Sequence, residues 1–232
     1  MPAKVVYAMC DRFSLTAPSK QLQEKYRIAA LHADYKPRYN ISPTQSIPII
    51  IHSEGERHLV EARWGLFPYW ARDSVNADFG SISGKKIFDR IVKRQRCLIP
   101  CSGFYGWRTE GKEQQAFHIV MREQQVFAMA GLYEMRVDPR GKLHRSCTIV
   151  TAMANPVVSS YHHRMPAIMD DEEQTSWLDP AMTDRYVLEN HIYSYPASAM
   201  RAYAVTPLSH NEELEAPELI EEFAPTLRLL KE

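Results

Sequence analysis

The spacing of apolar and polar residues predicts a chain built mainly from β-strands, with a few helices. Residues 46–53 are apolar and β-branched apart from Pro48, which suits an edge strand, and residues 58–66 alternate again after a short turn. These two segments predict a β-hairpin. Residues 18–30 carry apolar side chains at helical spacing after Pro18, and they predict a first helix.

The rest of the chain continues this pattern. Residues 82–95 fit a basic amphipathic helix. Two further helices are predicted after residue 169, one beginning at Asp170 and the other at Asp179–Pro180, and residues 200–205 form a last strand. Between the basic helix and the helices after residue 169, four strand-like segments are joined by short turns: 97–108, 116–121, 126–137 and 144–154. Such consecutive strands favour antiparallel neighbours.

These elements predict an α+β fold: a single domain with a mainly antiparallel, curved sheet or partial barrel and peripheral helices. No repeat, low-complexity tract or long linker divides the 232 residues. We expect the domain to span residues 10–223, with a C-terminal tail over 224–232. Residues 1–9 are then an N-terminal extension, either a wrongly assigned start or a pro-segment.

The composition excludes two broad classes of protein. With 45% hydrophobic and 24% charged residues, the chain has the profile of a folded globular protein rather than a disordered one. No apolar run approaches the roughly 18 residues of a membrane-spanning helix, so we expect no membrane partner. Four cysteines at this length make no disulfide scaffold, and we expect a cytoplasmic, intracellular protein that is monomeric.

Charge is balanced overall but uneven along the chain. The 28 basic and 28 acidic residues exclude a protein that coats nucleic acid through bulk charge. Residues 85–96 nevertheless hold six basic residues and one acid, whereas residues 212–222 hold six glutamates and no base. A basic helix is usually a solvated face. The alternative is a local groove wall that binds phosphates.

Few residues stand out as candidates for chemistry. Cys10 lies beside Arg12, and a nearby cation favours the reactive thiolate. His162 and His163 are adjacent, and because neighbouring side chains diverge in most backbones, one could act as a general acid or base while the other is structural.

Two other features have an ordinary and a functional interpretation. Aromatic residues gather in 63–70 and 103–107, where they either form core or stack on unpaired bases. Cys97 and Cys101 have a spacing that some zinc sites use, but no second Cys/His pair with finger-like spacing follows. We expect Cys97 and Cys147 to be small buried residues, with no metal or cofactor bound.

Seven short motifs in order resemble the SRAP family, the SOS response-associated peptidase-like proteins. The resemblance runs from Met9 to about Glu222. The motifs are Met9–Phe13, Arg38–Pro43, Trp64–Trp70, Asn76–Ala77, Cys97–Trp107, Thr151–Asn155 and His162–Pro166.

The resemblance implies a DNA-damage protein whose basic groove binds single-stranded DNA at abasic sites. It implies that an N-terminal cysteine, here Cys10, bonds covalently to the sugar aldehyde, with Asn76 and His162 as the other catalytic residues. Arg12 would hold a phosphate, and Pro43 and Trp70 would wedge and stack around the lesion. The remaining DNA-binding positions that we carry over or add from the basic helix are Asn40, Lys85, Lys86, Arg90 and Arg164.

The implied chemistry explains why the cysteine must be N-terminal. A free α-amine has a pKa of about 7.7–8.0 and is partly neutral at physiological pH, so it can form a Schiff base with the aldehyde. The neighbouring thiol can then close a five-membered thiazolidine ring. In this chain nine residues precede Cys10, so its nitrogen lies in a peptide bond. Either translation begins at Met9, which we favour, or the extension is cleaved off.

Four positions depart from the family pattern. Asp11 replaces a glycine, Asp78 and Gly80 stand where the pattern has arginine and glutamate, and Gly106 replaces a glutamate that the resemblance assigns to catalysis. These departures favour a diverged, non-catalytic relative that binds single-stranded DNA as the alternative to a crosslinking enzyme. A further alternative is an autoprocessing cysteine peptidase that cuts before Cys10 with His162 as its base. A protein-interaction domain with a merely solvated basic helix stays open as well.

Overall fold

The computed structural model describes most of the chain. The described residues are 11–69, 71, 73–82, 85–110, 113–123, 125–207 and 211–223. Two predicted site residues, Cys10 and Trp70, lie outside them, as does the side chain of Lys86.

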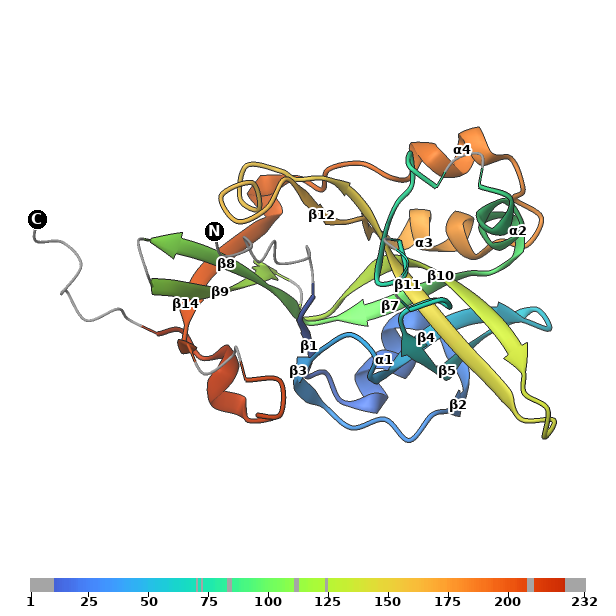
Figure 1. Cartoon of the computed structure of the whole chain (residues 1–232), viewed down its shortest axis with the longest axis horizontal. Helices are drawn as coiled ribbons and strands as arrows, with labels where there is room; N and C mark the ends of the chain where they lie inside the picture. The colour runs from blue at the N-terminus through green and yellow to red at the C-terminus, as the bar shows by residue number, and fades with distance from the viewer. Residues whose placement is uncertain are drawn as a thin grey trace, which may run out of the picture.

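Most of the described strands form two sheets (Figure 1). The smaller sheet has the order β14-β9-β8-β1-β3, and all four of its strand pairs are antiparallel. Its strands are β1 (Phe13–Leu15), β3 (Arg38–Ile41), β8 (Gly103–Glu110), β9 (Glu113–Met121) and β14 (Met200–Val205).

The larger sheet has the order β12-β11-β10-β7-β4-β5-β2, with β13 paired to β10 and β6 paired to β11. Its parallel pairs are β2 with β5, β11 with β5 and β11 with β6. Its strands are β2 (Ile28–His32), β4 (Ser46–Ser53), β5 (Glu56–Trp64), β6 (Asn76–Asp78), β7 (Arg96–Cys101), β10 (Phe127–Val137), β11 (Leu143–Met153), β12 (Arg164–Pro166) and β13 (Ile168–Met169).

The helices are short and peripheral. Figure 1 shows α2, α3 and α4 grouped at one end of the molecule, with β8 and β9 at the other. The α-helices are α1 (Ser19–Tyr26), α2 (Lys86–Arg94), α3 (Asp171–Leu178) and α4 (Arg185–Asn190), and two 3-10 helices are η1 (Ala197–Ala199) and η3 (Pro217–Ile220). In the described part of the chain, no helix combines the length and the apolar character needed to span a membrane.

The core forms where the larger sheet packs against its helices. Every residue of β7 is buried, and so are the first eight residues of β10, as expected for central strands. Trp64 and Trp177 are fully buried, and their indole N–H groups donate to the carbonyls of Val75 and Cys97 at 2.9 and 3.0 Å. Because both polar atoms are satisfied, two of the largest side chains lie in the core without a desolvation penalty.

The structure confirms the α+β fold, the 46–53/58–66 hairpin and the last strand, but several predicted boundaries were wrong. The predicted helix over 18–30 ends at Tyr26, because Arg27 adopts a left-handed conformation with φ of 52°. Ile28 then begins β2, which pairs with β5. The strand over 46–53 lies between β5 and β7 rather than at an edge. This strand, β4, pairs with β7 at Ile50, so Pro48 lies outside that pairing.

Two further boundaries needed correction. The segment 97–108 is not one strand: it breaks at Ser102, and its halves β7 and β8 belong to different sheets, so no single meander runs through the four segments. The last α-helix does not begin at Asp179–Pro180. It begins after Asp184, whose side chain accepts hydrogen bonds from the amides of Tyr186 and Val187. α2 likewise begins only at Lys86, four residues later than predicted.

Candidate functional site

The most polar junction among the predicted site residues lies where β6 and β12 flank β11. The guanidinium of Arg164, in β12, donates to the hydroxyl of Thr151 at 2.9 Å and to its carbonyl at 2.6 Å. The same guanidinium forms an ion pair with the carboxylate of Asp78, in β6, at 2.8 Å. Asn76 begins the same short strand, opposite Ile149 of β11. The sheet therefore brings Asp78 and Arg164 together, although they are far apart in the sequence. Asn76 lies at the other end of β6, because its partner Ile149 is four residues along β11 from Met153, the partner of Arg164.

His162 precedes this junction and is half-buried. Its Nδ1 accepts a hydrogen bond from the backbone amide of Arg164 at 3.1 Å, which assigns the remaining ring proton to Nε2. Burial lowers the pKa of His162, and the neighbouring His163 and Arg164 lower it further. The imidazole is therefore neutral near pH 7, with Nε2–H able to donate to a substrate oxygen.

The two adjacent histidines do not diverge as the sequence suggested. Their rings stack, with centroids 4.1 Å apart and an interplanar angle of 29°. His163 is the more exposed of the two.

Arg12 and Asn40 form a second polar cluster, in the smaller sheet. Arg12 is only 5% exposed, and its guanidinium donates to Asn40 Oδ1 at 2.9 Å and to Glu212 Oε1 at 3.1 Å. Asn40 is fully buried, and its amide donates to the carbonyls of Asn211 and Leu214 at 2.8 and 3.0 Å. Both residues thus hold the acidic segment 211–215, and a phosphate contact of Arg12 stays a prediction.

The acidic stretch predicted from the sequence is therefore partly packed onto basic groups of the smaller sheet. Glu215 pairs with Arg38 at 3.1 Å, and it accepts hydrogen bonds from the backbone amides of Tyr39 and Asn40. Pro43 lies in the turn after β3 and is half-buried. Its wedge role is untested.

The basic helix α2 does not join either cluster. Lys85 pairs with the nearly buried Asp73, and Asp89 pairs with Arg185 of α4. Arg90 is exposed. Figure 1 shows α2 at the opposite end of the molecule from β8 and β9, so Lys85 and Arg90 are not brought to the smaller sheet.

Position 106, where the family pattern has a glutamate, has no room for a side chain. A Cβ added to Gly106 would lie 2.9 Å from both Cβ and Cγ of Tyr161 and 3.2 Å from Ile119 Cδ1. The Tyr161 ring also packs on Phe117, with centroids 4.8 Å apart. Tyr161 therefore covers this part of β8 and β9.

Asp11, noted in the sequence only as a departure from the family glycine, has an unusual environment. It directly follows Cys10, and its Oδ1 atom is buried. Burial raises the pKa of its carboxyl to about 6, against the opposing effect of Arg12. The signal in the sequence was an acid next to the predicted nucleophile.

The other cysteines offer no second nucleophile. Cys97, Cys101 and Cys147 are free and fully buried in β7 and β11, and burial raises the pKa of each thiol. The expectation that Cys97 and Cys147 are small core residues is confirmed. No group of three or more potential metal ligands occurs within the described residues.

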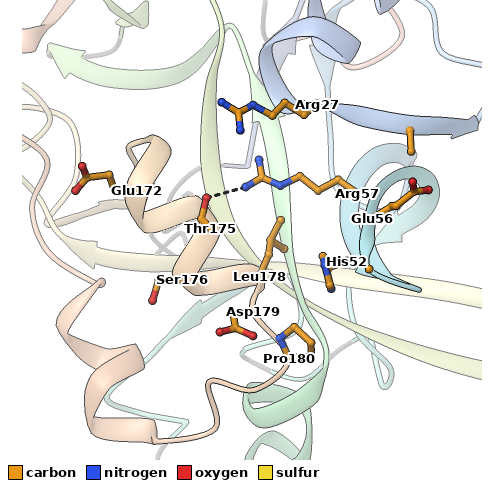
Figure 2. A pocket seen from close by; sticks show the side chains of 12 residues that line it. Arg27, His52, Glu56, Arg57, Glu172, Thr175, Ser176, Leu178, Asp179 and Pro180 are labelled. Atoms are coloured by element: carbon orange, nitrogen blue, oxygen red, sulfur yellow. Dashed lines mark hydrogen bonds between the residues drawn. The ribbon is translucent and has the colours of Figure 1, made fainter.

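A cavity of about 710 Å³ lies elsewhere, between α3 and the β4–β5 hairpin (Figure 2). Its walls mix basic and acidic side chains, and Figure 2 shows Arg57 reaching toward α3, where it donates to Thr175 Oγ1 at 3.0 Å. None of the predicted site residues lines it.

A buried histidine in β9 of the smaller sheet predicts a specific pH dependence of stability. His118 is hydrogen-bonded to Ser14 and Tyr203, each at 2.9 Å, and burial lowers its pKa to about 3. The folded state thus binds fewer protons than the unfolded state, whose histidine pKa is about 6.5. This contribution to stability is complete above pH 6.5 and is lost at about 1.4 kcal/mol per pH unit as the pH falls toward 3.

Urea unfolding at pH 7.5, 6, 5 and 4 measures this slope, and His118→Gln is expected to reduce it. Equal slopes in the two proteins would show that His118 is not the group responsible.

The comparisons with known proteins agree with the fold and with the motif order. The family model for SOS response associated peptidase (SRAP) matches residues 9–211. The abasic site processing protein YoqW of Bacillus subtilis (strain 168) is 36% identical over 92% of this chain and 99% of its own length. The abasic site processing protein HMCES of Xenopus tropicalis is 28% identical over 62% of this chain and 54% of its own.

A solved structure shows the same fold. A crystal structure of a protein from Bacteroides thetaiotaomicron superposes with a TM-score of 0.83 at 23% identity, covering 93% of this chain and all of that one. The match of the family model over most of the chain, together with the YoqW similarity, establishes that this protein belongs to the SRAP family.

Proposed function

We propose that this protein binds single-stranded DNA and bonds covalently to abasic sites through Cys10, once Cys10 is the N-terminal residue. The observation that carries the proposal is the similarity to YoqW, named as an abasic site processing protein, over 92% of the chain. The family model also begins its match at Met9, directly before Cys10. This supports a domain that starts at Cys10, with residues 1–9 as an extension.

The geometry suits the proposed partner. Asn76 and Arg164 lie on the two strands that flank β11, β6 and β12. The neutral His162 can donate from Nε2 to the ring oxygen or hydroxyl of the sugar, which assists ring opening to the aldehyde. Arg164 offers a cation for a DNA phosphate two residues after His162, but Asp78 holds it in an ion pair.

A denaturing gel tests whether the protein bonds covalently to abasic DNA. A version of the chain that begins at Met9 is incubated with a single-stranded oligonucleotide carrying one abasic site, and a slower-migrating covalent band is expected. The matched oligonucleotide with an intact base is the control. If no covalent band forms with the abasic strand, the proposed crosslinking function is wrong.

A second candidate function, a non-catalytic DNA-binding relative, is favoured by two observations. Position 106 has no carboxylate and no room for one beside Tyr161, and Asp78 neutralises Arg164. That candidate predicts salt-sensitive binding of single-stranded DNA without any covalent band. An autoprocessing peptidase instead predicts that the full chain loses residues 1–9 in the wild type but not in His162→Ala, which intact mass decides.

The ion pair predicts that Asp78→Asn binds single-stranded DNA more tightly. Removing the carboxylate frees Arg164 and takes away a negative charge that repels phosphate, so we expect affinity to rise by about three- to tenfold at low salt, with a steeper salt dependence. Fluorescence anisotropy with a labelled oligonucleotide measures both quantities. The exposed Asp34→Asn is the charge-matched control, and unchanged or weaker binding of Asp78→Asn would contradict the prediction.

A further inference from the structure

The cavity of about 710 Å³ in Figure 2 is lined by none of the residues of the proposed function. α3 forms one wall, and the β4–β5 hairpin with the start of β2 forms the other. Pockets for small organic ligands have volumes of about 300–1,000 Å³. This cavity is therefore large enough for a small molecule rather than for a single ion only.

Two arginine side chains enter the cavity from neighbouring strands. Arg57 is the second residue of β5 and pairs in the sheet with Ile28, so Arg27 lies next to it at the start of β2. Figure 2 shows that the guanidinium groups of Arg27 and Arg57 both project toward α3. Burial lowers the pKa of Arg57, and the positive charge of Arg27 lowers it further. The two cations are thus close enough to repel each other.

Neither arginine has a carboxylate partner among the residues that the structure describes. Arg57 donates to two neutral oxygens, the carbonyl of Tyr26 at 3.3 Å and Thr175 Oγ1 at 3.0 Å. The side chain of Arg27 makes no hydrogen bond or ion pair within the described segments. Two guanidinium groups therefore face the cavity without a counter-ion from the described chain.

The acids around the cavity do not neutralise this pair of cations. Glu56, Glu172 and Asp179 line it, but none of them forms an ion pair with either arginine in the described part of the chain. Figure 2 shows the carboxylates of Glu56 and Glu172 turned away from the guanidinium groups. Asp171 opposes the lowering of the Arg57 pKa, but it acts from beyond ion-pair distance. One wall of the cavity thus carries two unbalanced positive charges.

The backbone at Arg27 is unfavourable for an arginine. Arg27 ends α1 in the left-handed conformation, with φ of 52° and ψ of 50°. Glycine is the usual residue at such a helix end, because a Cβ is disfavoured in this conformation. An arginine here costs stability, and its side chain makes no contact within the described protein that offsets the cost. A ligand contact gives a reason for an arginine at this position.

We propose that this cavity binds a small molecule that carries a phosphate monoester, with Arg27 and Arg57 holding the phosphate. A phosphate monoester carries about −1.5 to −2 charges at pH 7, which matches two guanidinium groups without counter-ions. Each phosphodiester of a DNA backbone carries only one charge and matches them less well. Thr175 fixes the orientation of Arg57, and Leu178 and Pro180 offer apolar contacts to the organic part of the ligand.

Isothermal titration calorimetry with the full chain tests this binding. Adenosine 5′-monophosphate (AMP) is the probe, and adenosine is its matched control without a phosphate. We expect AMP to bind with a Kd of roughly 0.1–1 mM, inorganic phosphate to compete with it, and adenosine to bind at least about tenfold more weakly than AMP. Arg57→Gln and Arg27→Gly should each weaken AMP binding by about 10- to 100-fold. Arg140→Gln, at an exposed arginine outside the cavity, should leave it unchanged.

Thermal unfolding separates a ligand-binding role of Arg27 from a structural one. Arg27→Gly removes a strained residue and its repulsion with Arg57, so its unfolding midpoint without ligand should rise by about 2–4 °C. AMP should raise the midpoint of the wild type but not that of Arg27→Gly. Thr44→Gly relieves another left-handed residue, with φ of 72°, at an exposed neutral side chain outside the cavity. It should keep the response to AMP.

The source of the phosphate is decided with two single-stranded oligonucleotides, one with a 5′-phosphate and one with a 5′-hydroxyl. Tighter binding of the phosphorylated strand, lost in Arg27→Gly, would support the site and assign it to a DNA end. Equal binding of the two strands, with AMP binding that depends on Arg27 and Arg57, would support a small molecule.

Three results would overturn the inference. They are no binding of either AMP or inorganic phosphate, adenosine binding as tight as that of AMP, and AMP binding that Arg27→Gly and Arg57→Gln leave unchanged. A lower unfolding midpoint of Arg27→Gly together with unchanged AMP affinity would show that this arginine is structural. None of these results bears on the covalent reaction with abasic DNA, so the proposed function stands or fails separately.

Discussion

Replacing Cys10 with alanine is expected to abolish the stable covalent product with abasic DNA and to leave non-covalent binding unchanged. Alanine keeps the α-amine, which can still condense with the aldehyde, but the resulting imine hydrolyses readily. Only the thiol can close the ring and make the product persist on a denaturing gel. The expected loss is therefore complete without a reducing agent.

In the same experiment, borohydride distinguishes an imine, which it reduces to a stable amine, from the thiazolidine ring, which is stable without it. It should trap the imine of Cys10→Ala as a permanent bond, which shows that the variant still brings its amine to the aldehyde. Non-covalent affinity for DNA with a tetrahydrofuran site, which has no aldehyde, serves as the control for folding and binding. A stable band from Cys10→Ala without borohydride would show that the ring is not the product.

The largest expected effect on stability comes from Gly103→Ala. A Cβ at this first residue of β8 would lie 2.5 Å from His118 Cε1 and 2.8 Å from Val120 Cγ1. His118 is buried and is held by Ser14 and Tyr203, so it cannot move away without losing hydrogen bonds. Overpacking and the lost hydrogen bonds together should cost about 3 kcal/mol or more of unfolding free energy.

Gly80→Ala is the matched control, because its added Cβ would have only Asp78 Oδ1 nearby, at an ordinary 3.7 Å. Urea unfolding at pH 7.5 measures both variants, and the control should change by no more than about 1 kcal/mol. A Gly103→Ala protein as stable as the wild type would contradict the packing described between β8 and His118.

Local patterns predicted most strands, but not where the chain changes sheets. The apolar, β-branched run over 46–53 and the strand-like segment 200–205 were each predicted with the correct bounds. The break at Ser102 was missed because the chain is buried and strand-like on both sides of it, while the backbone leaves the larger sheet for the smaller one. The end of α1 was missed because Arg27, unlike glycine, gives no signal of a left-handed conformation.

In the candidate site too, contacts between distant segments could not be predicted from local patterns. Motif order identified Asn76, His162 and Arg164, but the pairing of Arg164 with Asp78 depends on β6 lying parallel to β11, a contact between distant segments. The burial of Arg12 against Glu212 depends likewise on where residues 211–215 pack. In both cases a basic side chain pairs with an acid that is distant in the sequence, Arg164 with Asp78 and Arg12 with Glu212.

If Cys10 forms a thiazolidine with an abasic site, the intact mass of the crosslinked product reveals it. The version that begins at Met9 is analysed by mass spectrometry before and after reaction with a single-stranded abasic oligonucleotide. We predict a free protein that begins at Cys10 and a product, stable without borohydride, whose mass is the sum of protein and oligonucleotide minus one water. Free protein that begins at Cys10 but yields no such product would contradict the claim.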